Sequence, residues 1–129
     1  MAMLHREPNQ VKWVGVRPGH DGTQVAVSGR TNNVVLILYT VTALKTFHLT
    51  GGIIGLNAGA AAAGNDMWVR NAADVIQYYI VNQWMPVNLS INFSFAFNPP
   101  LEIPAGWDIV LSTTAVSANI EAFIHGWEE

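Results

Sequence analysis

The stretch PVNLSINFSFAFNPP, residues 86–100, decides the fold. From residue 87 to residue 97, apolar side chains occupy every second position, and short side chains, most of them polar, fill the positions between. This period of two is that of a β-strand with one buried face. Because prolines stand at both ends, we expect one strand of eleven residues, about 36 Å long. Such a strand crosses a whole β-sandwich and sets the register of its sheet.

The opposite face of this predicted strand carries no charge. It consists of Asn88, Ser90, Asn92, Ser94 and Ala96, whereas a strand face open to water usually contains Lys or Glu. We therefore expect another subunit or the N-terminal segment to cover it.

Further short strands follow from the same alternation. Residues 34–41 and 118–127 are largely apolar on both of their faces, which favours contact with the core on one side and with a partner on the other. No segment shows a sustained helical period with caps. About eight strands indicate a β-sandwich, and the similarity of residues 41–49 to residues 103–111 favours a jelly roll, whose two Greek keys repeat one corner.

We therefore predict an all-β fold, a jelly-roll sandwich of about eight antiparallel strands over residues 31–129. Residues 1–30 form an N-terminal arm with one short hairpin in this prediction, because a turn rich in Pro and Gly at residues 17–22 separates two short alternating runs. The chain has 129 residues, of which 50% are hydrophobic and 12% charged, so one domain with a substantial core is expected.

Composition also excludes several classes of protein. The absence of Cys rules out disulfides and thiolate metal sites. The first residues lack the apolar run of a signal peptide, and the longest apolar run, residues 34–39, is too short to span a bilayer. We expect a soluble protein that is made in the cytoplasm and does not bind a membrane.

The net charge of -3 is unevenly distributed. Bases prevail up to residue 30, and acids prevail after it. Four scattered bases in a chain of pI about 5.7 do not predict nucleic-acid binding, which needs a clustered basic stripe. The basic head is either an ordinary solvated surface or a segment that docks on an acidic protein surface.

The sequence predicts no catalytic residue, metal site or cofactor. The four histidines are dispersed, and none has a second His or a carboxylate at the spacing of a metal site. GGIIG at residues 51–55 lacks the Lys and the following helix of a phosphate loop and instead predicts a strand bulge. Five tryptophans could line a sugar-binding groove, but core and interface anchors are the favoured interpretation. Trp84, expected in a loop, is the residue to test for contact with a glycan.

Three segments resemble a known family. LYTVTALKTFHL at residues 38–49, PLEIPAG at residues 100–106 and the terminal IHGWEE are similar to corners and strands of small jelly-roll virion proteins of tailed bacteriophages. Thr42 and Leu44 stand where that pattern usually has Pro and Gly. The resemblance covers roughly residues 34–129. It implies a trimer with the architecture of tumour necrosis factor, and a role as a capsid decoration protein or as the receptor-binding head of a tail fibre.

From these observations we expect a non-enzymatic homotrimer located in the virion. Only about thirty residues precede the predicted jelly roll, without heptads, whereas a fibre head needs a shaft. Decoration is therefore preferred, with the arm docked on the major capsid protein or another virion protein. The alternative is a receptor-binding or carbohydrate-binding head of a tail fibre or baseplate that contacts a cell-surface glycan. The predicted trimer interface comprises Asn88, Ser90, Asn92, Ser94, Phe123, His125 and Trp127; the predicted capsid-docking residues are Arg6, Lys12, Trp13 and Arg17.

Overall fold

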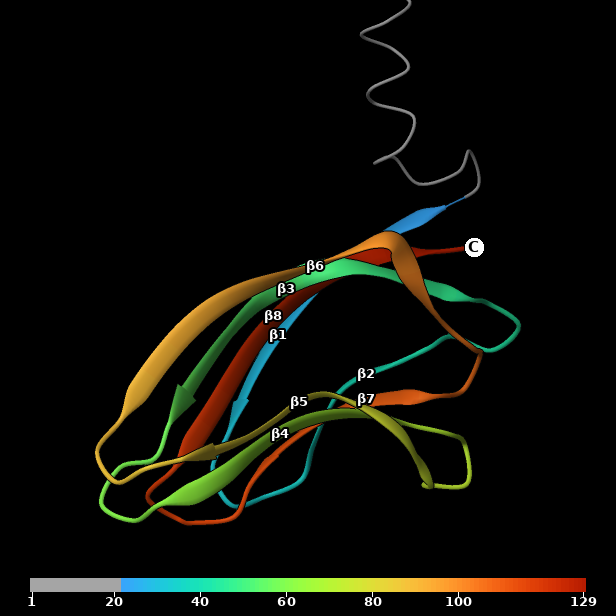
Figure 1. Cartoon of the computed structure of the whole chain (residues 1–129). Coiled ribbons are helices and arrows are strands. Elements are labelled where there is room, and N and C mark those ends of the chain that lie inside the picture. The colour runs from blue at the N-terminus through green and yellow to red at the C-terminus, as the bar shows by residue number, and fades with distance from the viewer. Residues whose placement is uncertain (1–21) are drawn as a thin grey trace, which may run out of the picture.

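The computed structural model describes residues 22–129, which form two four-stranded antiparallel sheets packed face to face (Figure 1). The first sheet has the order β1-β8-β3-β6 and the second sheet the order β2-β7-β4-β5. The described part contains no helix, and hence none long and apolar enough to cross a membrane. The strands are β1 (Thr23–Thr31), β2 (Leu36–Thr40), β3 (Phe47–Asn57), β4 (Ala63–Arg70), β5 (Ile76–Met85), β6 (Ser90–Ile103), β7 (Asp108–Thr113) and β8 (Asn119–Glu128).

The strand pairing confirms the predicted sandwich of eight antiparallel strands. β1 pairs with β8, β2 with β7, β3 with β6 and β4 with β5. The chain thus behaves as one long hairpin whose strand pairs alternate between the two sheets, which is the strand order of a jelly roll. Two further pairings, β3 with β8 and β4 with β7, join these pairs into the two sheets.

The two corners that align in the sequence adopt the same turn. In the first, between β2 and β3, the Lys45 N–H donates to the Thr42 carbonyl at 3.1 Å; in the second, between β6 and β7, the Trp107 N–H donates to the Pro104 carbonyl at 3.2 Å. The third residue of each turn has a positive φ, 66° at Leu44 and 76° at Gly106. Each corner carries the chain from one sheet to the other, so their equivalence in sequence has a structural basis.

The end of β8 holds the first corner in place. The Glu128 side chain is buried, and its Oε1 accepts a hydrogen bond from the Thr42 N–H at 2.8 Å. Burial acts to raise the pKa of Glu128, but hydrogen bonds from Thr42 and Tyr39 and the charge of Lys45 outweigh it and lower that pKa. Burial and the same carboxylate raise the pKa of Tyr39 to about 12. The final strand and the first corner are therefore one hydrogen-bonded unit.

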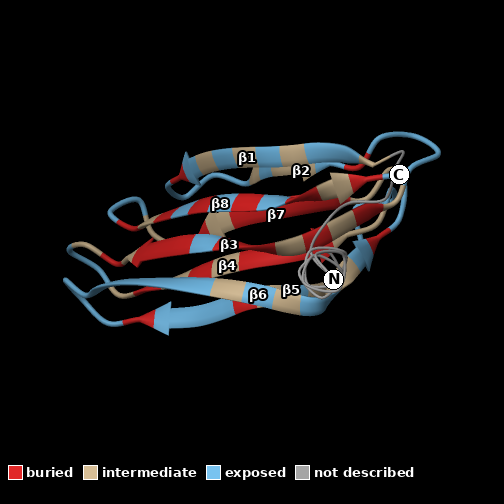
Figure 2. Cartoon of the chain, turned by 90° about the horizontal axis from the view of Figure 1, so that it is seen from above, coloured by how far each residue is buried: buried red, intermediate tan, exposed pale blue. Residues whose placement is uncertain are grey.

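The core lies between the sheets and is formed by alternate residues of the central strands (Figure 2). In β8, Ile120, Ala122 and Ile124 face inward, as predicted, and are at most 4% exposed. The strands at the sheet margins are more exposed than the central strands β3, β4, β7 and β8. The largest fully buried side chains are those of Val41, Phe47, Leu49, Ile54, Leu56, Met67, Met85, Ile103, Ile109, Leu111, Ile120 and Ile124.

The long alternating strand differs from its prediction in place and in extent. It forms β6, whose apolar side chains face inward opposite buried residues of β3. Because β6 lies at the margin of its sheet, Ile91 and Phe93 remain 39% and 37% exposed. Its prolines do not end it: Pro99 and Pro100 lie where pairing with β3 is interrupted, and a marginal strand accepts residues that cannot donate.

Two other expectations need correction. Residues 23–30, assigned to the arm from the sequence, belong to β1, which pairs with β8 along its whole length. The first half of the predicted arm hairpin lies outside the described residues. Trp84 does not lie in a loop but in β5, opposite Gly64 of β4. β5 continues to Met85 because Met85 is a core residue on the inward face.

The turn at Leu44 generates a stability prediction. A left-handed conformation costs a residue with a Cβ about 1–2 kcal/mol, and Leu44 is 98% exposed, so its side chain contributes little packing. Leu44→Gly should therefore raise the free energy of unfolding by about 0.5–1 kcal/mol, after subtraction of the larger backbone entropy that Gly loses on folding. Urea unfolding of both proteins measures it. In the control, Ala43→Gly should lower stability, since Ala43 has no positive φ to relieve; a loss of stability in Leu44→Gly would contradict the argument.

Candidate interaction surface

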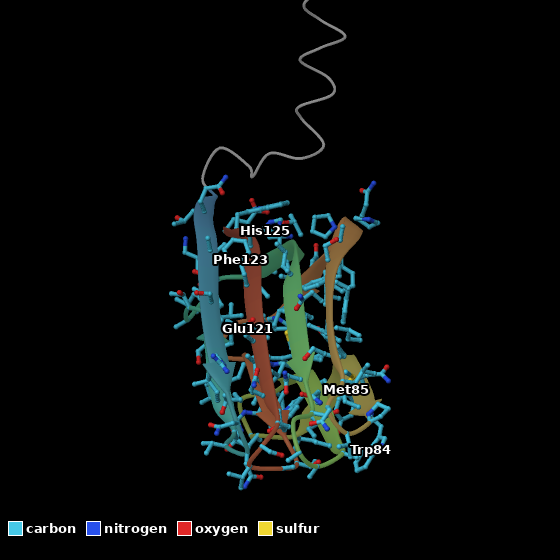
Figure 3. The ribbon with its side chains drawn as sticks, turned by 90° about the vertical axis from the view of Figure 1, so that its left-hand side faces the viewer. Trp84, Met85, Glu121, Phe123 and His125 are labelled. Carbon is cyan, nitrogen blue, oxygen red and sulfur yellow. The ribbon has the colours of Figure 1, made fainter. Side chains whose placement is uncertain are left out.

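The outer face of the first sheet brings together most of the residues predicted for the trimer interface. Figure 3 shows Glu121, Phe123 and His125 one after another along β8. Strand register extends each of these residues into a row across all four strands. From β1 to β6 the rows are Arg30-Glu121-Gly55-Asn92, Ser28-Phe123-Ile53-Ser94 and Ala26-His125-Gly51-Ala96.

These three rows carry little charge. Arg30 and Glu121 are their two ionised members, of opposite sign and directly opposite each other on neighbouring strands. Phe123 and Ile53 lie side by side in the central row and are 40% and 56% exposed. An apolar centre inside a weakly charged surface is typical of a protein interface rather than of a face that contacts water.

A hollow of about 430 Å³ lies beside this apolar centre. Gly55 is one of its lining residues, and side chains of the two neighbouring strands lie close over this glycine. The Oδ1 atom of Asn92 and the Cγ atom of Glu121 lie 2.8 and 3.1 Å from the position that a Cβ would take there. Phe123, Ile53 and Arg30 also line it, so the hollow has an apolar wall and a polar rim.

The predicted bulge shapes the same face. The register of β3 shifts between Leu49 and Gly51 against both of its neighbours, which confirms the bulge expected from the glycines. A Cβ at Gly52 would lie 2.1 Å from the backbone oxygen of Phe123, so this close approach requires Gly. Thr50, the extra residue, donates its hydroxyl proton to the His125 carbonyl at 2.8 Å, and its Oγ1 lies 2.6 Å from His125 Nδ1. The bulge therefore orients His125 on the outer face.

At one end of the face an aromatic pair adjoins two carboxylates. The rings of His48 and Trp127 stack with centroids 4.9 Å apart. Nε2 of His48 lies 3.3 Å from the Glu129 carboxylate, and Nδ1 lies 3.9 Å from that of Glu102. Among residues 22–129 the buried indole N–H of Trp127 finds no acceptor.

The structure locates all the predicted site residues except those of the arm. Asn88 is not on the outer face; it lies in the turn before β6 with a φ of 58°, and its N–H donates to the Gly59 carbonyl. Trp84 lies on the outer face of the second sheet and is 63% exposed. The arm residues Arg6, Lys12, Trp13 and Arg17 lie outside the described residues. The other six residues predicted for the trimer interface do lie on the outer face of the first sheet: Ser90, Asn92, Ser94, Phe123, His125 and Trp127.

Four residues of the face were missed by sequence reasoning: Arg30, Ile53, Gly55 and Glu121. Ile53 and Ile54 are identical neighbours in an apolar strand, yet Ile53 faces outward and Ile54 is buried. The spacing of Gly51, Ile53 and Gly55 by two was the available signal, because it marks one strand face with small side chains around a single apolar one. Arg30 was missed because the sequence prediction assigned it to the arm, whereas it lies in β1 of the first sheet.

The described residues contain no group of three or more His, Asp or Glu side chains that could hold a metal ion. Comparison of the chain with protein-family models and with curated proteins finds no match.

Two glycines of β3 provide a matched test of the face. Gly52→Ala places a Cβ against backbone, which cannot move without separating β3 from β8, and should lower the free energy of unfolding by about 3 kcal/mol or more. Gly55→Ala meets only the ends of the Asn92 and Glu121 side chains, so the loss should stay within about 1 kcal/mol. Chemical denaturation of both variants measures the difference. Equal stability of the two would contradict the close approach at the bulge.

Proposed function

We propose that this protein is a non-enzymatic structural component of a bacteriophage virion, a capsid decoration protein that assembles as a homotrimer. The outer face of the first sheet is the observation that carries the self-association, because it places six of the seven predicted interface residues on one weakly charged surface. The phage setting and the number of three subunits rest on the sequence resemblance of the corners and of the C-terminal strand.

The charges of this face favour a second copy as its occupant. The three rows offer one basic and one acidic side chain, Arg30 and Glu121, and these stand opposite each other. A strongly acidic or strongly basic partner would therefore find too few opposite charges on this face. Around a threefold axis, the other two copies of the chain bring the same neutral rows and the same pair of opposite charges to this face. Ionised groups that lose water without a partner are costly, so a neutral surface fits best against another neutral surface.

The size and shape of the face suit such an interface. Four strands about 4.8 Å apart and about ten residues long at 3.3 Å each cover roughly 600 Å² before side-chain relief is added. A specific interface typically buries about 800 Å² per partner. Phe123 and Ile53 form an apolar projection beside a hollow of about 430 Å³, a volume in the range that holds a small ligand and hence an aromatic side chain.

The sandwich also gives the arm a defined point of attachment. Thr23, the first residue of β1, pairs with Glu128, so the described chain begins at the end of the sandwich that carries the two corners. In the proposed assembly the arm, with Arg6, Lys12, Trp13 and Arg17, docks on the capsid from that end. The loops between strands at the opposite end then face away from the capsid.

A receptor-binding or carbohydrate-binding head remains the second candidate. The exposed indole of Trp84 on the other sheet is the observation that favours it.

The self-association predicts a loss of assembly on a single substitution. Phe123→Glu introduces a charge at the apolar centre of the face and should convert the trimer into a monomer of 14.1 kDa at micromolar concentration. Val75→Glu is the matched control. Val75 is 55% exposed in the turn between β4 and β5 of the second sheet, so this variant should stay trimeric. Light scattering coupled to gel filtration measures the mass, and circular dichroism shows that both variants remain folded. A trimeric Phe123→Glu protein, or a monomeric wild type, would contradict the proposal.

The arm mechanism generates a separate prediction. Replacing Arg6, Lys12 and Arg17 together by Gln in the full chain should weaken binding to undecorated capsids of the encoding phage by tenfold or more, because three arms per trimer act together. Lys45→Gln, a base in the first corner, is the control and should bind as wild type does. Co-sedimentation with capsids measures the affinity. Unchanged binding of the triple variant would exclude the arm as the docking element.

A further inference from the structure

The outer face of the second sheet carries an exposed aromatic ring opposite a glycine. Trp84 of β5 is 63% exposed and stands opposite Gly64 of β4. A Cβ at Gly64 would lie 3.8 Å from Cε3 of the indole and 3.3 Å from Cγ2 of Thr114. The position is held from the backbone, because the Gly64 N–H donates to Thr114 Oγ1 at 2.8 Å and the Thr114 N–H donates to the Gly64 carbonyl at 3.1 Å. Thr114 thus packs over the backbone at Gly64, and Gly64 places no side chain of its own on the exposed indole.

The next row along the same face is polar. Asn82 of β5 stands opposite Asp66 of β4, which stands opposite Ser112 of β7. Within residues 22–129 these three side chains make no hydrogen bond or ion pair. Further along β4 and β7, by contrast, Arg70 and Asp108 form an ion pair, with Nε and Oδ2 3.0 Å apart. Asp66 is partly buried, and burial raises the pKa of its carboxyl group. A row of unpaired acceptors and donors thus adjoins the ring.

The spacing of the two rows fits one sugar unit. Residues two apart on a strand are separated by about 6.6 Å, comparable to the length of a single pyranose. Such a sugar has an apolar face of C–H groups, which packs on a flat aromatic ring, and a rim of hydroxyl groups, which need both donors and acceptors. Asp66 accepts hydrogen bonds, whereas Asn82 and Ser112 both donate and accept.

We propose that Trp84, Gly64 and Thr114, together with Asn82, Asp66 and Ser112, form a binding site for a neutral glycan. The ring supports the apolar face of one sugar, and the polar row binds its hydroxyl groups. The carboxylate of Asp66 repels sialylated, sulfated and phosphorylated ligands, so the ligand class is an uncharged saccharide. Gly64 contributes no side chain to the site, and Thr114 bounds the site beside it.

The place of the site in the fold suits this role. Figure 3 shows Trp84 near the end of the sandwich opposite to the start of β1. The site lies on the second sheet, whereas the proposed self-association uses the first sheet. Glycan binding does not rest on the proposed assembly, and in a trimer formed through the first sheet the site would stay open to solvent.

The test uses the full chain and an array of immobilised oligosaccharides. One set consists of neutral oligomers of glucose, galactose, mannose and rhamnose, and a matched set carries sialic acid or sulfate. Wild type should bind members of the neutral set and none of the anionic set. Trp84→Ala should weaken that binding by about tenfold or more, since the ring supplies most of the apolar contact, and Trp84→Phe should weaken it less.

The remaining variants separate the site from general effects. Asp66→Asn keeps the shape of the side chain and should weaken neutral binding at least severalfold, because the charged acceptor is lost. Val75→Ala is the control, because Val75 is also exposed but lies in the turn between β4 and β5, at the other end of these strands from Trp84, and this variant should bind as wild type does. The inference is overturned if no neutral oligosaccharide binds, if only anionic ones bind, or if Trp84→Ala binds like wild type. None of these results depends on assembly, because monomeric Phe123→Glu should bind the same oligosaccharides per subunit.

Discussion

A β-strand turns successive side chains to opposite faces, and a sandwich of two sheets has one interior. Every apolar residue on the wrong face of a strand therefore stays in contact with water unless something else covers it. In β3, for example, Ile54 faces the interior and is fully buried, whereas its neighbour Ile53 faces outward and is 56% exposed. In β8, Ile124 is likewise buried, whereas its neighbour Phe123 faces outward and is exposed. Because the register joins Ile53 and Phe123 in one row, the exposed apolar residues of two strands form one surface instead of two isolated contacts.

The glycines of β3 make this surface possible. Gly51 and Gly52 allow the backbones of β6 and β8 to approach β3 at the bulge, and Gly55 lines the hollow beside the apolar row. The same strand thus supplies close backbone contacts within the sheet and one wall of the hollow on its outer face. On the second sheet the exposed Trp84 stands opposite Gly64 and beside a polar row. The two proposals therefore use different outer faces, one for a copy of the chain and the other for an uncharged saccharide.

Much of this fold could be predicted from the sequence, because period-two alternation determines which face each side chain occupies. Alternation could not place the strand of residues 86–100 at the sheet margin, since it says nothing about which strands are neighbours. Trp84 was expected in a loop because the polar residues Asn82 and Gln83 interrupt the apolar run before it and Pro86 follows shortly after. The repeat of the two corners was recognised despite Leu44, whose φ of 66° matches that of Gly106.

The candidate surface was predicted in outline. The uncharged face of β6 and the outward residues of β8 were both identified, but their joining across β3 depends on sheet order, which no single strand reveals. Residues 23–30 were assigned to the arm because their alternation follows a turn rich in Pro and Gly, and the pairing with β8 is a contact between the two ends of the chain. Arg30 and the hollow were missed for that reason.

Residue-level oxidative footprinting of the wild-type chain tests most directly whether a second copy covers the outer face of the first sheet. Phe123 and Ile53 are 40% and 56% exposed in the single chain, and Val75, in the turn between β4 and β5 of the second sheet, is 55% exposed. The account predicts that labelling of Phe123 and Ile53 falls to the level of buried residues at concentrations where the chain assembles and rises on dilution, while labelling of Val75 stays constant. Equal labelling of Phe123 and Ile53 at every concentration would contradict it.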